Sequence, residues 1–203
     1  MILKRLELGM WASNCYIVGD ETSKQGLVVD PGEEPDEIIN TIKRLGLDIK
    51  IIVATHGHAD HVGAIAEVKE ATGAPVAIHS HDAGSLRGGG MFSWGRTRGS
   101  SADRLLEDGD SIDVNDLHFE VLHTPGHTSG GICLYGHEVV FTGDTLFYHS
   151  VGRTDIGGGT HEELIRSIYK KLLPLPDKTV VYPGHGPPST IGAERHGNPF
   201  LRR

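Results

Sequence analysis

The chain has 203 residues, of which 37% are hydrophobic and 23% are charged, as is typical of a globular protein with a sizeable core. Its formal net charge of −8 argues against a surface for nucleic acid, and no apolar run approaches the roughly 20 residues that span a membrane. The N-terminus shows no signal-peptide pattern, so we expect a cytoplasmic protein. Cys15 and Cys133 lie in apolar runs and are predicted to be core residues rather than a disulfide. The sequence does not indicate the oligomeric state.

The first half alternates short apolar runs with helical patterns. Strands are predicted at residues 3–8, 15–18, 27–29, 50–54 and 76–78. A helix begins near Pro35 and ends before Gly46, and a second one covers about residues 61–72 and is closed by Gly73. This half is therefore predicted to fold as β-β-β-α-β-α-β.

The second half is again rich in strands. A Gly- and Arg-rich stretch at residues 84–99 is predicted to be a loop, and a second loop covers residues 143–159. Thr160 and Glu163 predict the start of a helix over 160–172. The predicted strands are 111–114, 117–122, 132–135, 139–142 and 179–182. Two halves of similar make-up favour an α/β four-layer sandwich, with two β-sheets back to back and helices outside, in a single domain over residues 1–203.

Potential metal ligands are most concentrated just after the predicted strand at 50–54. His56, His58, Asp60 and His61 fall within six residues, at the point where a buried strand leads into a helix. Neutral imidazoles and a carboxylate that converge on one point are ligands for zinc, iron or manganese. A histidine-rich surface turn is the alternative, but it offers no reason for such a density of ligands beside an apolar strand.

Three further ligands follow other apolar strands, each beside a glycine: His127, Asp144 and His185. Loops at strand ends are where sheets place their sites. The seven candidates are too many for one catalytic metal, which takes about three protein ligands and keeps one position open. We therefore predict two divalent metal ions that share one carboxylate, with zinc the first choice and iron or manganese as alternatives.

These motifs also carry a family resemblance. T-H-G-H-A-D-H at 55–61, T-P-G-H-T at 124–128, F-T-G-D at 141–144 and P-G-H-G at 183–186 resemble the metallo-β-lactamase superfamily in order and spacing. Asn14-Cys15-Tyr16, residues 152–155 and the C-terminal residues 186–200 look like its glyoxalase II (hydroxyacylglutathione hydrolase) branch, in the short bacterial form. The resemblance implies an αβ/βα sandwich. It also implies that His56, His58 and His127 hold one metal, that Asp60, His61 and His185 hold the other, and that Asp144 bridges them.

The chemistry expected of such a site is hydrolysis. Two cations lower the pKa of a shared water, Asp60 orients the resulting hydroxide, and the hydroxide attacks a carbonyl carbon. A thiolate leaves with little help from a general acid, because a free thiol has a pKa near ~8.5. The resemblance therefore implies a small-molecule substrate, a thioester of the hydroxyacyl-glutathione type.

Substrate contacts are predicted in the 84–99 loop. Arg87, Arg96 and Arg98 could pair with carboxylates of an anionic thioester while Trp94 closes over it as a lid. A solvated surface loop is the alternative. Full-length glyoxalase II carries a C-terminal helical domain for glutathione, and this chain ends soon after His185, so another thioester also remains open. Arg153 and Asp155 are predicted to form an ion pair that supports the site from behind the ligands.

Rival functions arise from the same superfamily. A sulfur (persulfide) dioxygenase uses one iron held by two histidines and one aspartate, and a lactonase or another ester hydrolase keeps the hydrolytic chemistry. A secreted β-lactamase and a nuclease are disfavoured by the N-terminus and by charge. A metal-binding protein without turnover is a further alternative. The remaining histidines are expected to be surface or turn residues: His79, His81, His118, His137, His149, His161 and His196. His123 could equally lie behind the ligands or simply end its strand.

Overall fold

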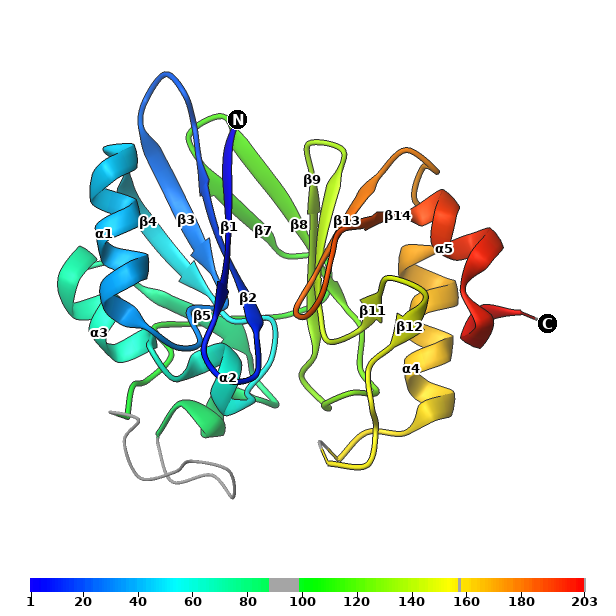
Figure 1. Cartoon of the computed structure of the whole chain (residues 1–203). Coiled ribbons are helices and arrows are strands. Elements are labelled where there is room, and N and C mark those ends of the chain that lie inside the picture. The colour runs from blue at the N-terminus through cyan, green and yellow to red at the C-terminus, as the bar shows by residue number, and fades with distance from the viewer. Residues whose placement is uncertain (88–98, 157, 203) are drawn as a thin grey trace.

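The computed structural model describes residues 1–87, 99–156 and 158–202 (Figure 1). Its first sheet has six strands in sequence order: β1 Ile2–Leu8, β2 Ser13–Gly19, β3 Gln25–Val29, β4 Asp48–Val53, β5 Val76–His79 and β6 Arg104–Leu106. The first three pair antiparallel and the last four pair parallel, so the sheet is mixed. Two crossover helices, α1 Pro35–Leu45 and α3 Ile65–Thr72, cover its outer face (Figure 1).

The second sheet also has six strands, in the order β14-β13-β10-β9-β8-β7. Their bounds are β7 Ser111–Val114, β8 Leu117–His123, β9 Ile132–Gly136, β10 Val139–Gly143, β13 Val180–Pro183 and β14 Ser189–Thr190. Only β10 and β13 pair parallel, so this sheet is mixed as well. Helix α4 His161–Ser167, which continues as a π-helix over Ile168–Leu172, and α5 Ile191–Gly197 lie on its outer face (Figure 1).

Three apolar clusters separate the four layers. The central one lies between the sheets and includes Tyr16 of β2 and Phe141 of β10, whose ring centroids are 5.1 Å apart. The outer two join each sheet to its own helices. Strand β2 is buried along its whole length, as expected of a strand covered on both faces. This arrangement confirms the predicted four-layer sandwich, and both of its sheets are mixed. The central cluster contains residues from both halves of the chain.

Several local predictions are confirmed. Every predicted strand is present, and the Thr160 side chain caps α4 by accepting a 3.2 Å hydrogen bond from the Glu163 N–H. Both cysteines are free and buried. The prediction of one helix over residues 61–72 is wrong at its N-terminal end. The structure has a short helix α2, Ala59–Val62, followed by the separate helix α3. The helix breaks at Gly63 and Ala64, so that Asp60 and His61 lie in the separate helical turn α2.

Short elements were not predicted. They are β6, β14, α5, the 3₁₀-helices Ala83–Arg87 and Pro199–Leu201, and the hairpin of β11 Leu146–Phe147 with β12 Ser150–Val151. These elements are two to seven residues long, which is too short for a clear periodicity, and they are held by neighbours that only the fold supplies. No helix in the described ranges is long and apolar enough to cross a membrane.

The fold brings four strand ends to one edge. His56 follows the carboxyl end of β4, while His127, Asp144 and His185 follow those of β8, β10 and β13. Strands β8 and β10 both pair antiparallel with β9, and β10 pairs parallel with β13. All three strands therefore run in the same direction. A backbone hydrogen bond from the Asn14 N–H to the Gly184 carbonyl, 2.7 Å, joins β2 of the first sheet to this edge.

Candidate metal centre

Three histidine nitrogens converge in the first ligand cluster. The Nδ1 atom of His58 lies 3.1 Å from Nε2 of His56 and 2.9 Å from Nε2 of His127. Burial, followed by the neighbouring histidines, lowers the pKa of His56 well below its usual value, and burial also lowers that of His58. Lone pairs on neutral imidazoles repel at such distances unless a cation lies between them. The donor set therefore fits a divalent metal.

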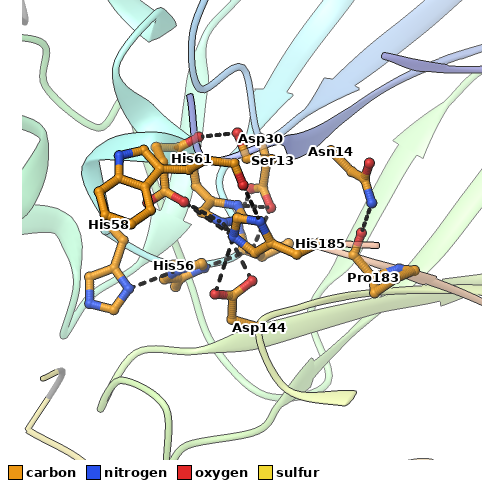
Figure 2. Close-up of polar contacts among 12 residues, drawn as sticks. Ser13, Asn14, Asp30, His56, His58, His61, Asp144, Pro183 and His185 are labelled. Atoms are coloured by element: carbon orange, nitrogen blue, oxygen red, sulfur yellow. Dashed lines mark hydrogen bonds and ion pairs between the residues drawn. The ribbon is translucent and has the colours of Figure 1, made fainter. Parts of the chain in front are cut away.

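The second cluster contains one carboxylate and two imidazoles. Oδ2 of Asp60 lies 3.5 Å from Nε2 of His61 and 3.2 Å from Nε2 of His185, and the two histidine nitrogens are 3.2 Å apart. His61 is fully buried on α2, and His185 reaches the cluster from the loop after β13 (Figure 2). These distances are the spacing expected of ligands that surround one ion.

Asp144 lies between the two clusters (Figure 2). Its Oδ1 atom is 3.4 Å from Nε2 of His61, and its Oδ2 atom is 3.4 Å from Nε2 of His127. Oδ1 is buried and has no hydrogen-bond partner among the residues that the structure describes. A buried carboxylate oxygen without a donor is costly, so the arrangement fits an ion on each side of this side chain. Gly184 makes room for it, because a Cβ there would lie 2.2 Å from Oδ1.

Hydrogen bonds behind the ligands set their tautomers. The Nδ1–H groups of His127 and His185 donate to the carbonyls of Arg153, at 2.6 Å, and Trp11, at 3.1 Å. His61 donates its Nδ1–H to Oδ2 of Asp30, at 3.0 Å. In all three rings the Nε2 atom is then left free to face the metal position.

Asp30 lies behind the ligands of both clusters and was not predicted as a site residue from the sequence. Its two oxygens accept from the Thr55 N–H and the Thr55 hydroxyl, both at 2.6 Å, in addition to His61. The Thr55 oxygen in turn lies 3.1 Å from Nδ1 of His56, so Asp30 orients a ligand of each cluster. The sequence showed this residue only as the end of a strand. Its position at the carboxyl end of β3, beside β4, was the available signal.

Asp30→Asn is expected to weaken metal binding at the second cluster about ten- to a hundredfold, because the amide cannot accept all three hydrogen bonds. A smaller loss is expected at the first cluster, which Asp30 reaches only through Thr55. Stepwise metal affinities and the Tm of the metal-free protein measure both effects. Asp20→Asn is the matched control, since Asp20 accepts from the backbone of Thr22 and Ser23 in a turn at the opposite end of β3. Equal affinities in the two variants would contradict this role.

The two clusters differ in the pKa values of their histidines. Burial opposes a charge on His61, but the carboxylates of Asp144, Asp30 and Asp60 together raise its pKa to about 10. Burial likewise opposes a charge on His185, but the hydrogen bond with Asp60 and the charges of Asp144 and Asp60 together outweigh it and raise that pKa. The metal-free second cluster therefore holds protons at neutral pH that a metal must displace, whereas His56 and His58 of the first are neutral.

Metal affinity should therefore depend on pH more strongly at the second cluster than at the first. A raised pKa means that protons compete more strongly as the pH falls, so affinity at the second cluster should drop by up to about tenfold per pH unit and displaced proton. The first cluster should change little over the same range. Zinc titrations of the metal-free protein between pH 6 and pH 9 test this. A parallel loss at both sites would contradict it.

The structure brings together all seven predicted ligands, and Arg153 and Asp155 form the expected bidentate ion pair with two 2.7 Å contacts. That pair lies at the surface, and it is the Arg153 carbonyl that contacts His127. Arg87 is exposed at the end of its 3₁₀-helix. Arg96, Arg98 and Trp94 lie outside the described residues, so the lid stays a prediction.

A third group of histidines does not form a comparable site. His79 is buried, contrary to the expectation of a surface residue, and lies near His81 and His123. The rings of His79 and His123 stack, with centroids 4.1 Å apart and planes 9° apart. A metal lies in the plane of each imidazole that binds it. His79 and His123 are stacked face to face in nearly parallel planes, so no position near both nitrogens lies in both planes and these two rings cannot share one ion. Both His81 and His123 instead donate to the Ser129 carbonyl, at 3.3 and 3.0 Å.

Comparison with known sequences covers almost the whole chain. A profile of the metallo-beta-lactamase superfamily matches residues 8–185. The chain is 38% identical to the probable metallo-hydrolase YqgX of Bacillus subtilis, over 98% of this chain and 96% of that one. It is 37% identical to the hydroxyacylglutathione hydrolase GloC of Haemophilus influenzae, over 99% of this chain and 98% of that one.

Solved structures match equally fully. The BLEG-1 B3 metallo-beta-lactamase superposes with a TM-score of 0.94 at 37% identity over 100% of both chains. TTHA1623, in a di-iron-bound form, gives 0.86 at 38% identity over 98% of this chain and 100% of that one. ETHE1 from Myxococcus xanthus gives 0.84 at 33% identity over 98% of this chain and 84% of that one. The similarity therefore includes both sheets and every loop that carries a ligand.

Proposed function

This chain belongs to the metallo-beta-lactamase superfamily of metal-dependent hydrolases, and we propose that it hydrolyses an anionic thioester of a small thiol at a two-metal centre. The observation that carries the proposal is the position of Asp144, whose oxygens face both clusters, with one of them buried and lacking a donor. A single metal would leave three converging ligands of the other cluster without a role.

Each cluster has its own part in this proposal. His56, His58 and His127 would hold the first ion, Asp60, His61 and His185 the second, and Asp144 both. When bound, two such ions supply a water of lowered pKa and an acceptor for negative charge on the carbonyl oxygen. Zinc suits the imidazole-rich donor set best, and iron or manganese would also fit it. Burial opposes the charge on Asp60, but the hydrogen bond with His185 and the charges of His61 and His185 lower its pKa to about 2. Asp60 therefore stays ionised and can orient the attacking water.

The states of the Cys15, Cys133 and Tyr16 side chains also favour a substrate whose leaving group departs without a general acid. Burial raises the pKa of Cys133 to about 11 and that of Cys15 well above its usual value, so neither thiol is a ready nucleophile. The Tyr16 hydroxyl, which could have served as an acid, instead donates to the Pro183 carbonyl at 2.6 Å. A thiolate leaving group needs no such acid, whereas an amide nitrogen does.

Relatives support the substrate class. GloC carries the name of a hydroxyacylglutathione hydrolase and aligns over 98% of its own length, so a protein with that name has the size of this chain. We therefore propose hydroxyacyl-glutathione thioesters as the first substrates to examine. Arg87, Arg96 and Arg98 with Trp94 remain our proposed contacts for the anionic part.

The decisive experiment is metal analysis of the purified protein combined with hydrolysis assays on lactoyl-glutathione, other thioesters, a lactone and a β-lactam. The proposal expects two metals per chain and the highest kcat/KM on a thioester. A β-lactam is included because BLEG-1 is named a metallo-beta-lactamase. Two bound metals with no thioester turnover above that of the metal-free protein would refute it.

The second candidate is the iron-dependent sulfur dioxygenase. His56 or His58 with His127 and Asp144 supply two imidazoles and a carboxylate, a donor set that one iron accepts with positions open for oxygen. One iron per chain together with oxygen uptake on a glutathione persulfide would favour this function over hydrolysis. The complete second cluster is the reason that we rank it lower.

A further inference from the structure

Asp82 is a buried carboxylate outside the two ligand clusters. It lies in the turn between β5 and the 3₁₀-helix Ala83–Arg87 and is only 6% exposed. Its Oδ2 accepts from the Gly57 N–H at 2.9 Å and from the Thr128 hydroxyl at 2.7 Å, and its Oδ1 accepts from the Gly130 N–H at 2.9 Å. A carboxylate withdrawn from water needs such donors, and here all three come from other segments of the chain.

Those segments are the two loops that carry the first ligand cluster. Gly57 lies between His56 and His58, and Thr128 directly follows His127. The loops follow strands of different sheets, β4 and β8, so no strand pairing holds one against the other. A backbone hydrogen bond from the Ile132 N–H to the Thr55 carbonyl, 2.9 Å, also joins the two loops. Asp82 bridges them at residues directly next to the ligands, Gly57 and Thr128.

The backbone on both sides is shaped to let this carboxylate approach. A Cβ at position 130 would lie 2.5 Å from Oδ1 of Asp82, and one at position 57 would lie 2.5 Å from Oγ of Ser85 in the same 3₁₀-helix. Glycine at these two positions allows close contact that any other residue would prevent. The segment around Asp82 therefore packs tightly against both loops.

We propose that Asp82 is a positioning residue for the first metal site, which it sets by holding the loops of His56–His58 and of His127 at a fixed separation. The inference rests on the proposed two-metal function. The three nitrogens lie 2.9 to 3.1 Å from one another in consecutive pairs, and metal affinity depends on ligands held within about 0.5 Å of their required positions. Asp30 holds the same ligand segment from the opposite side, through Thr55 and His61.

Asp82→Asn tests the proposal. The amide leaves one of the two backbone N–H groups facing another donor, so the loops must separate. Zinc affinity at the first site should fall about ten- to a hundredfold. We would measure it by competition with a chromophoric chelator, in the full chain and in an Asp60→Ala background that isolates the first site. Affinity at the second site should stay within about threefold. Thr128→Val, which keeps Asp82 and removes one donor, should weaken the first site about three- to tenfold.

Asp103→Asn is the matched control, because Asp103 also accepts a backbone hydrogen bond, from the Val76 N–H at 2.8 Å, away from the clusters. Wild-type first-site affinity in both Asp82→Asn and Thr128→Val would overturn the proposal, and so would an equal loss at both sites. If Asp82→Asn does not fold, Thr128→Val decides. The readout is zinc affinity, so it is independent of the substrate: a wild-type protein that binds two zinc ions but lacks thioesterase activity refutes the function and leaves this inference standing.

Discussion

Asp144→Ala is expected to lower kcat/KM by about 10³-fold or more and to leave at most one tightly bound metal per chain. Asp144 is the side chain whose two oxygens face both clusters, at 3.4 Å from His61 and 3.4 Å from His127. Its loss removes a ligand from each ion and also the negative charge that offsets two adjacent cations. The five histidines would then have to hold two dications with only Asp60 to compensate them.

Metal content by elemental analysis and steady-state kinetics on the best thioester would measure this effect. Asp144→Asn separates charge from shape, since the amide keeps the volume and one acceptor oxygen. It should bind metal better than the alanine variant and still lose most activity. Asp103→Asn, an aspartate remote from the clusters, should behave as the wild type. Two metals and wild-type kcat/KM in Asp144→Ala would contradict a bridging carboxylate.

Asp60→Ala is the second change with a large expected effect, and it should be selective. We expect loss of the second metal, retention of the first and a fall in kcat of about 10²- to 10³-fold. The carboxylate is within 3.5 Å of His61 and 3.2 Å of His185, but it has no ion-pair contact with His56, His58 or His127 among the described residues. Without it, the two histidines of the second cluster lose the charge that favours a cation between them.

This variant should fold, because the backbone at position 60 is held independently of the side chain. The Ser13 hydroxyl donates to the Asp60 carbonyl at 2.8 Å, and Gly32 packs so closely that a Cβ there would lie 1.7 Å from that oxygen. One metal per chain, an unchanged far-UV spectrum and weak residual turnover are therefore expected. Full activity with both metals in Asp60→Ala would show that the ligands are divided in another way.

Much of the candidate site could be predicted from local sequence. Ligands within six residues of one another, as in His56 to His61, must be close in space whatever the fold. Glycine beside His127, Asp144 and His185, each after an apolar run, marked three further strand ends. The strands themselves were recognisable because their burial is continuous or alternates along the chain, as in β2 and β8.

Other features depended on segments far apart in sequence. At the break of the predicted 61–72 helix into α2 and α3, the Ala64 N–H donates to the carbonyl of Pro31, 33 residues earlier in the chain, at 3.0 Å. The burial of His79 follows from its stacking on His123. Hairpin β11–β12 and strand β14 have partners that no short stretch of sequence specifies.

The sequence alone determined which residues are candidate metal ligands and predicted two ions, because ligand type and number are properties of side chains and of their local spacing. Only the tertiary structure decided that Asp144 faces both clusters and that Asp30 and Asp82, each at the end of a neighbouring strand, hold the ligand loops in position. These contacts join residues 17 to 83 positions apart, from Asp144 with His127 to Asp144 with His61. Such contacts form only when the strands of each sheet pair and the two sheets pack together, and nothing in the local pattern around either residue encodes them.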